Sequence, residues 1–277
     1  MRWLKWLTLT LLAYVAVAFT LRLDWLEVAS QVVRPRLPAG AGGHDVLLMV
    51  VAVFGTTISP YLFFWQAAQE MEDTSGSEPH TSAEVRHHLR RIKADTIIGM
   101  GFSNLIAFFI ILSTAATLHA AGMTDIQTSA QAAEALRPLA GELTFLLFSL
   151  GIIGTGLLAV PVLAGSAAYA VAEAAGGHGS LSARLDKGEG RGFYSVIAAA
   201  TVGGVTLCFM PTDPVKELFW SAVLNGVIAV PIMAVMMLLA CRHEVMGTHV
   251  IGPRLRWLGW IATGVMAGTV FAMLLSW

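Results

Sequence analysis

Residues 55–66 read GTTISPYLFFWQ and lie inside a segment, 46–69, that is otherwise apolar enough to cross a membrane. A membrane-spanning helix needs about 20 mostly apolar residues, so this segment is long enough. Gly, two Thr, Ser and Pro near its middle are residues that weaken or interrupt a helix. The fold of the chain therefore depends on what the backbone does at these positions.

Pro60 is the strongest helix breaker in this stretch. It has no amide hydrogen, and its ring clashes with the carbonyl group of Thr56, four residues earlier. It also disfavours helical angles at Ser59, while Gly55 adds backbone freedom. We therefore expect two half-helices, residues 46–54 and 60–69, with the helix broken over residues 55–60. Pro60 would then occupy the first turn of the second half, where a missing amide hydrogen costs nothing.

A break at this depth has two readings that residue types alone leave open. Unwound backbone within a bilayer is tolerated only where protein or a water-filled cavity covers it. Its carbonyls can coordinate a cation, and the amide end of the second half can face an anion. The alternative is a proline kink whose freed carbonyls accept hydrogen bonds from threonine hydroxyls.

Composition places the whole chain in a membrane. Of 277 residues, 56% are hydrophobic and only 13% are charged, with a mean hydropathy of +0.70; soluble domains average about 25% charged residues. A formal net charge of −1 excludes a basic nucleic-acid surface. Cys208 and Cys241 lie in apolar segments and suggest no disulfide framework.

Seven segments are long and apolar enough to span a bilayer, and we expect them to be helices of an all-α membrane protein with one transmembrane domain over residues 1–277. They are residues 3–21, 46–69, 96–119, 143–172, 193–210, 218–241 and 257–277. The first segment, with Arg2 and Lys5 before it and Ala16-Val17-Ala18 near its end, also resembles a cleavable signal peptide.

Basic residues are unevenly distributed between the loops. Of the 17 Lys and Arg, one side of the predicted topology carries Arg22, Arg34, Arg36, Arg137 and Lys216, and the amino-terminal side carries the rest. The positive-inside rule therefore predicts a cytoplasmic amino terminus and an external carboxyl terminus.

The sequence VVAVFGTTISPYLFFWQAAQEMED, residues 50–73, precedes a basic loop and GMGFSNLIAFFIILSTAATLH, residues 99–119. These two stretches resemble the sixth and seventh helices of the NRAMP family of divalent metal-ion transporters, which have a LeuT-like fold built from inverted repeats. The resemblance covers essentially the whole chain, from that family's fifth helix to its eleventh. It implies a transporter rather than an enzyme, in a bacterial cytoplasmic membrane, that works by alternating access with proton coupling.

The resemblance also implies a site. In the family's sixth helix a Met-Pro-His triplet supplies a thioether ligand, and the carbonyl three residues earlier supplies a second. The matching positions are Ser59-Pro60-Tyr61 and Thr56, with Gly55 and Thr57 beside them. A hydroxyl in place of a thioether favours hard ions such as Mg²⁺ or Mn²⁺, and members that lack this methionine include a magnesium-transporting branch. The ion is the transported substrate, and no cofactor is expected.

A cation in a low-dielectric site needs negative charge nearby, yet no Asp or Glu lies in the middle of a predicted span. Asp45 is about 21 Å from Ser59 along a helix. In the family, the carboxylate comes from an Asp-Pro-Gly break in a first helix that precedes the segment matched here. We therefore expect a fragment that carries half a site, is inert alone and requires those amino-terminal helices as partners.

Two polar residues at membrane depth are further candidates. Asn104 could hydrogen-bond between helices or line the pathway, and Asn225 lies in the span that matches the family's tenth helix, where polar side chains can approach the metal. Two other functions stay open: an amino-acid or amine transporter of the same fold, and a membrane scaffold that transports nothing.

Overall fold

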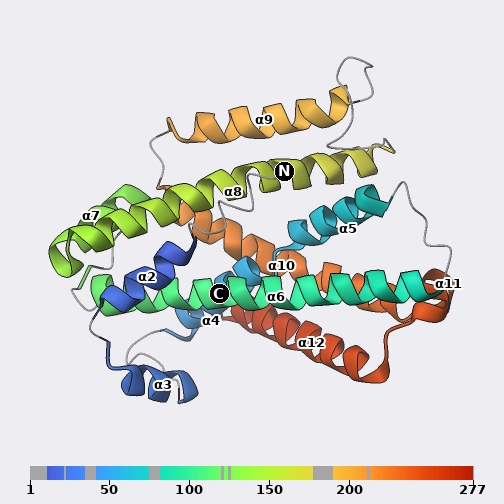
Figure 1. Ribbon diagram of the computed structural model, residues 1–277, viewed down its shortest axis with the longest axis horizontal. Helices are drawn as coiled ribbons and strands as arrows, with labels where there is room; N and C mark the ends of the chain where they lie inside the picture. The colour runs from blue at the N-terminus through green and yellow to red at the C-terminus, as the bar shows by residue number, and fades with distance from the viewer. Residues whose placement is uncertain are drawn as a thin grey trace. The chain divides into compact units, whose positions relative to one another are not determined.

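The computed structural model describes residues 11–21, 23–34, 42–74, 82–119, 122–123, 126–176, 190–210 and 213–276. Within these ranges every regular element is a helix (Figure 1). The helices are α2 (Leu12–Thr20), α3 (Trp25–Val33), α4 (Gly43–Thr57), α5 (Pro60–Thr74), α6 (Ser82–Thr114) with a π-helical end (Ala115–His119), α7 (Ser129–Ala140), α8 (Glu142–Ala174), α9 (Arg191–Leu207), α10 (Pro214–Ala240), α11 (His243–Met246) with a 3₁₀ turn (Gly247–His249), and α12 (Pro253–Leu275).

Five helical stretches are long and apolar enough to cross a membrane. They are Gly43–Glu72, Glu84–His119, Glu142–Ala174, Pro214–Ala240 and Pro253–Leu275. Each coincides with a predicted span. Helix α9 corresponds to the predicted span 193–210 but has only 17 residues. Residues 3–10 of the first predicted span lie outside the described residues.

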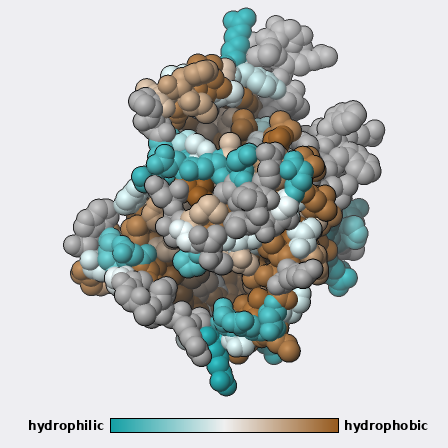
Figure 2. Space-filling model, turned by 90° about the vertical axis from the view of Figure 1, so that its left-hand side faces the viewer, coloured by the Kyte–Doolittle hydropathy of each residue, from teal (hydrophilic) through white to brown (hydrophobic). Residues whose placement is uncertain are grey.

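Large apolar side chains are exposed along these helices, as expected of a protein whose solvent is lipid. On α8 they recur every three or four residues, which places them on one face of the helix: Leu143, Leu146, Leu150, Ile153, Leu157 and Val160. Figure 2 shows hydrophobic residues, in brown, at the surface of the face it presents. The chain is an all-α integral membrane protein.

The chain divides into two compact units, and the first contains residues Met1–Arg34 and Phe64–Val215. In it, α8 packs along α9, as Figure 1 shows, and also against α2 and α7. Aromatic rings pack directly against two glycines of α8. The ring of Tyr14 lies where a Cβ at Gly151 would be, and the ring of Trp65 does the same at Gly165. These glycines therefore make room for aromatic side chains.

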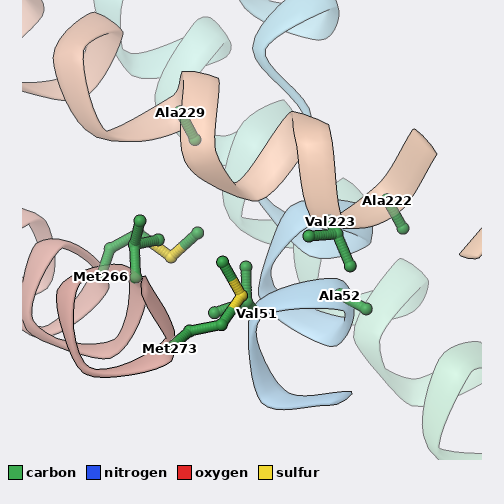
Figure 3. Packing of buried hydrophobic residues seen from close by; sticks show 8 residues of the cluster. Val51, Ala52, Ala222, Val223, Ala229, Met266 and Met273 are labelled. Atoms are coloured by element: carbon green, nitrogen blue, oxygen red, sulfur yellow. The ribbon is translucent and has the colours of Figure 1, made fainter. Parts of the chain in front are cut away.

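The second unit contains residues Pro35–Phe63 and Lys216–Trp277, and its core is formed by α4, α10 and α12. Val51, Ala229 and Met266 are almost fully buried there. Figure 3 shows Val51 of α4 beside Met273 of α12, with Val223 of α10 above them. Ile58, at the end of α4, packs against this core. Apolar packing therefore anchors the point at which the helix is interrupted.

Candidate functional site

The helix that contains residues 55–60 is interrupted, but over a shorter stretch than the sequence predicted. Helix α4 continues to Thr57, and α5 begins at Pro60. Ile58 leaves helical geometry, with φ −104° and ψ 66°, while its amide still donates to the Phe54 carbonyl at 2.7 Å. Only Ile58 and Ser59 are non-helical. The predicted link began at residue 55, and it was too wide because Gly55, Thr56 and Thr57 keep their helical turns.

Ser59 occupies the centre of the interruption. It is 3% exposed, and its hydroxyl oxygen lies 2.9 Å from the Thr56 carbonyl oxygen and 3.2 Å from the Gly55 carbonyl oxygen, to which it can donate. The Thr56 carbonyl would face the amide of residue 60 in a continuous helix, and Pro60 has none. The Ser59 hydroxyl therefore takes the place of the missing donor. It also brings together the two atoms that the sequence predicted as metal ligands.

The two threonines make a different contact. The hydroxyls of Thr56 and Thr57 both donate to the carbonyl of Val53, at 2.8 and 2.9 Å. The kink reading expected threonine hydroxyls to satisfy the carbonyls that proline frees. That assignment is wrong in detail, since Ser59 does so and the threonines bond one turn earlier. Back-bonding of this kind tends to bend a helix, and it leaves both hydroxyls occupied.

Gly55 has a different role from the one the sequence suggested. It is buried inside α4, and a Cβ at this position would overlap the carbonyl oxygen of Ala222 in α10. The contact is reciprocal, because a Cβ at Gly226 would lie 2.7 Å from the carbonyl oxygen of Val51. Gly55 therefore allows α4 and α10 to approach backbone to backbone. The sequence carries a signal for this contact, since Ala222 and Gly226 are small residues four apart on one helix face.

The other predicted site residues differ in burial and in the part of the chain to which they belong. Pro60 is buried, and Tyr61 and Asn225 are half-buried. Asn225 immediately precedes Gly226, so it lies on the turn of α10 that touches α4, within the same unit as the break. Its side chain makes no hydrogen bond to any residue that the structure describes. Asn104 belongs to α6 in the other unit, and its place in the pathway stays a prediction.

The oxygens at the break are all uncharged. Among the described residues, no three His, Cys, Asp or Glu side chains come together in a way that could hold a metal ion. Asp45 lies in the first turn of α4, at the opposite end of that helix from Ser59. The arrangement can offer one hydroxyl and two carbonyl oxygens to a ligand, and it cannot by itself neutralise a divalent charge.

Comparison with known proteins agrees with the sequence motif. A family model described as natural resistance-associated macrophage protein-like matches residues 1–276. A divalent metal cation transporter MntH of Bradyrhizobium diazoefficiens is 24% identical over 270 residues, which cover 96% of this chain and 58% of that protein. The MntH of Agrobacterium fabrum is 28% identical over 216 residues, covering 75% of this chain and 44% of that protein.

The MntH of Burkholderia ambifaria is 24% identical over 250 residues, which cover 88% of this chain and 51% of the relative. The chain thus spans about half the length of these relatives. All three are named as transporters rather than enzymes. Together with the five membrane-length helices and the interrupted helix before Pro60, the match over nearly the whole sequence shows that the chain belongs to the Nramp family.

Proposed function

We propose that the protein to which this sequence belongs transports a hard divalent cation, such as Mg²⁺ or Mn²⁺, and that Thr56 and Ser59 supply two of its oxygen ligands. The distance between the Ser59 hydroxyl oxygen and the Thr56 carbonyl oxygen carries the proposal. It is 2.9 Å. Magnesium binds oxygen at about 2.0–2.1 Å with octahedral geometry, which separates neighbouring ligands by about 2.9 Å. An ion could bridge these atoms without moving the backbone.

Binding would exchange one interaction for another. The Ser59 hydroxyl now donates its hydrogen to a carbonyl. Rotation about the Cβ–Oγ bond would turn that hydrogen away and leave a lone pair for the ion, while the Thr56 carbonyl would lose a donor and gain the cation. Both ligands are hard oxygens, and a hydroxyl stands where the family's motif has a thioether. The ligand set therefore favours hard cations over Cd²⁺.

The site needs a negative charge that the oxygens at the break do not provide. Several neutral ligands rarely offset the hydration that a divalent ion loses in a low-dielectric environment. We propose that a carboxylate from another helix of the whole protein completes the site, that transport proceeds by alternating access, and that it is linked to protons. The amino terminus of this segment would face the cytoplasm, in a bacterial cytoplasmic membrane. Asn225 and Asn104 would line the pathway.

The names of the relatives support a metal ion over the amino-acid alternative, since all three are called divalent metal cation transporters. The scaffold alternative makes a separate prediction, because a scaffold would fold without binding ions at the break.

Ion binding by the purified full chain in detergent tests the proposal. Calorimetric titration should detect weak binding of Mn²⁺ that excess Mg²⁺ displaces. Ser59→Met should raise affinity for Cd²⁺ by about tenfold and weaken Mg²⁺ binding, because a thioether is a soft ligand. Ser195→Met is the matched control, since Ser195 is an exposed serine of α9 whose hydroxyl also donates to a carbonyl. An unmodified chain that binds Cd²⁺ but neither Mg²⁺ nor Mn²⁺ would overturn the hard-ion proposal, and Mn²⁺ binding that Ser59→Met leaves unchanged would show that the ion does not bind at the break.

A further inference from the structure

The first two turns of α12 carry a cavity that lies apart from the helix break. It has a volume of about 350 Å³, and the described residues that line it are Pro253, Arg256, Trp257 and Trp260. These positions are separated by three, one and three residues, so they form one face of the helix. The volume is at the lower end of the range for small-molecule sites, about 300–1,000 Å³. One guanidinium and two indoles therefore share a space that a small anionic group could enter.

Three exposed arginines lie within residues 242–256, and one of them, Arg256, lines this cavity. Arg242, Arg254 and Arg256 are exposed, and none forms an ion pair or a side-chain hydrogen bond with any described residue. Between Arg242 and Arg256 the only carboxylate is that of Glu244, and His243 and His249 add two titratable groups. This positive cluster occurs in a chain whose formal net charge is −1. It is a local excess of positive charge that a bound anion would balance.

The position of the arginines on the helix is unfavourable without an anion. Helix α12 has no acidic residue in its first turn, and its N-cap, Gly252, makes no side-chain cap. Arg254 and Arg256 instead place two positive charges at the positive end of the helix dipole, where anions stabilise and cations destabilise. A bound anion would compensate both the dipole and the guanidinium groups.

The surroundings indicate a lipid rather than a dissolved anion. Helix α12 is long and apolar enough to cross a membrane from Pro253 to Leu275, which would place its first turns at a bilayer boundary. Trp257 is 72% exposed and Trp260 is 37% exposed, and tryptophan is enriched at that boundary. Leu255, Leu258 and Ile261, which neighbour these tryptophans in the sequence, are also exposed. A phosphate bound by Arg256 would thus have apolar surface beside it for acyl chains.

We infer that this cavity binds the headgroup of an anionic phospholipid, with Arg256 and Arg254 holding the phosphate and Trp257 and Trp260 packing against the glycerol region. Planar guanidinium groups can hold phosphate oxygens through two hydrogen bonds. The inference is independent of the proposed transport and does not involve the residues at the helix break.

Native mass spectrometry of the purified full chain in detergent tests the inference directly. With phosphatidylglycerol added, the unmodified chain should retain one tightly bound lipid, and phosphatidylcholine of the same acyl composition should bind more weakly. Arg254→Gln with Arg256→Gln should weaken phosphatidylglycerol binding by about 25-fold, which is about fivefold for each basic residue at an anionic membrane surface. Arg86→Gln with Arg90→Gln is the matched control, because both arginines are exposed on α6 and the double change removes the same two charges.

Each outcome decides the question. Equal retention of the two lipids by the unmodified chain overturns the inference, even if the double variant does not fold. Displacement of phosphatidylglycerol by millimolar inorganic phosphate would also overturn it, because the site would then be one for soluble anions. An equal loss of phosphatidylglycerol in the Arg86→Gln, Arg90→Gln control would overturn the inference, because it would show only a general attraction between charges. The assignment is supported if only the Arg254→Gln, Arg256→Gln variant loses phosphatidylglycerol, and if replacing Arg256 by Lys instead of Gln partly restores binding.

Discussion

Residues 55–60 of α4 and α5 and residues 156–166 of α8 share three residue types that bear on helix continuity, yet they have opposite structures. The first stretch reads GTTISP and the second GLLAVPVLAGS, so each contains glycine, proline and serine within a membrane-length apolar segment. The helix is interrupted before Pro60. Helix α8 continues through Pro161 from Glu142 to Ala174. Composition alone therefore does not decide whether a transmembrane helix breaks.

The order of the residues accounts for the difference. Ser59 immediately precedes its proline, and its hydroxyl reaches the carbonyls three and four residues back. Ser166 follows Pro161 by five residues and bonds the carbonyl of Val162, inside a helix that already satisfies its backbone. A serine directly before proline can replace the lost amide donor, so the chain can leave the helix there without an unsatisfied buried carbonyl.

The glycines offer the largest test of this comparison. Gly55→Val should destabilise the chain by about 3 kcal/mol or prevent folding, because its side chain would meet the backbone of α10. Gly156 lies in α8 with nothing within 4 Å of a Cβ, and Gly156→Ala should stabilise by about 0.5–1 kcal/mol. Unfolding in sodium dodecyl sulfate, followed by circular dichroism, measures both. Equal effects of the two substitutions would contradict the close contact between α4 and α10.

Substitution of the two prolines should give the next largest difference in stability. Pro161→Ala restores an amide donor inside a continuous helix and should stabilise the chain by about 1–3 kcal/mol. Pro60→Ala should change stability by less than about 0.5 kcal/mol, because first-turn positions need no helical donor. The same unfolding assay compares them. A larger stabilisation by Pro60→Ala, with a rise in the helical signal, would contradict this expectation. It would show that Pro60 holds the chain in a non-helical conformation at a cost in stability.

The serines should show the smallest difference. Ser59→Ala removes the hydroxyl shared by two carbonyls in a buried position and should cost about 1–2 kcal/mol. Ser166→Ala should cost less than about 0.5 kcal/mol, because the amide of residue 166 serves the Val162 carbonyl in the intact helix. Thermal unfolding in detergent can resolve this gap. A cost for Ser166→Ala that matches the cost for Ser59→Ala would mean that the Ser59 hydroxyl has no special role.

Several features of the candidate site could be predicted from the sequence. The interruption next to Pro60 follows from the chemistry of proline, and the pairing of Thr56 with Ser59 came from the family's motif. The roles of neighbouring residues could not be predicted in the same way. Glycine is typical of flexible links, yet Gly55 remains helical because α10 lies against it. Thr56 and Thr57 could bond several carbonyls, and only the folded backbone selects Val53.

By itself, the sequence determined the membrane class, the family and the neighbourhood of the break. Apolar length, the steric demands of proline and a contiguous motif are all properties of neighbouring residues. Only the tertiary structure decided that the interruption is confined to Ile58 and Ser59, that Gly55 meets the backbone of α10, and that an arginine and two tryptophans of α12 line a cavity. These features depend on which helix packs against which, and that packing brings together residues far apart in the chain.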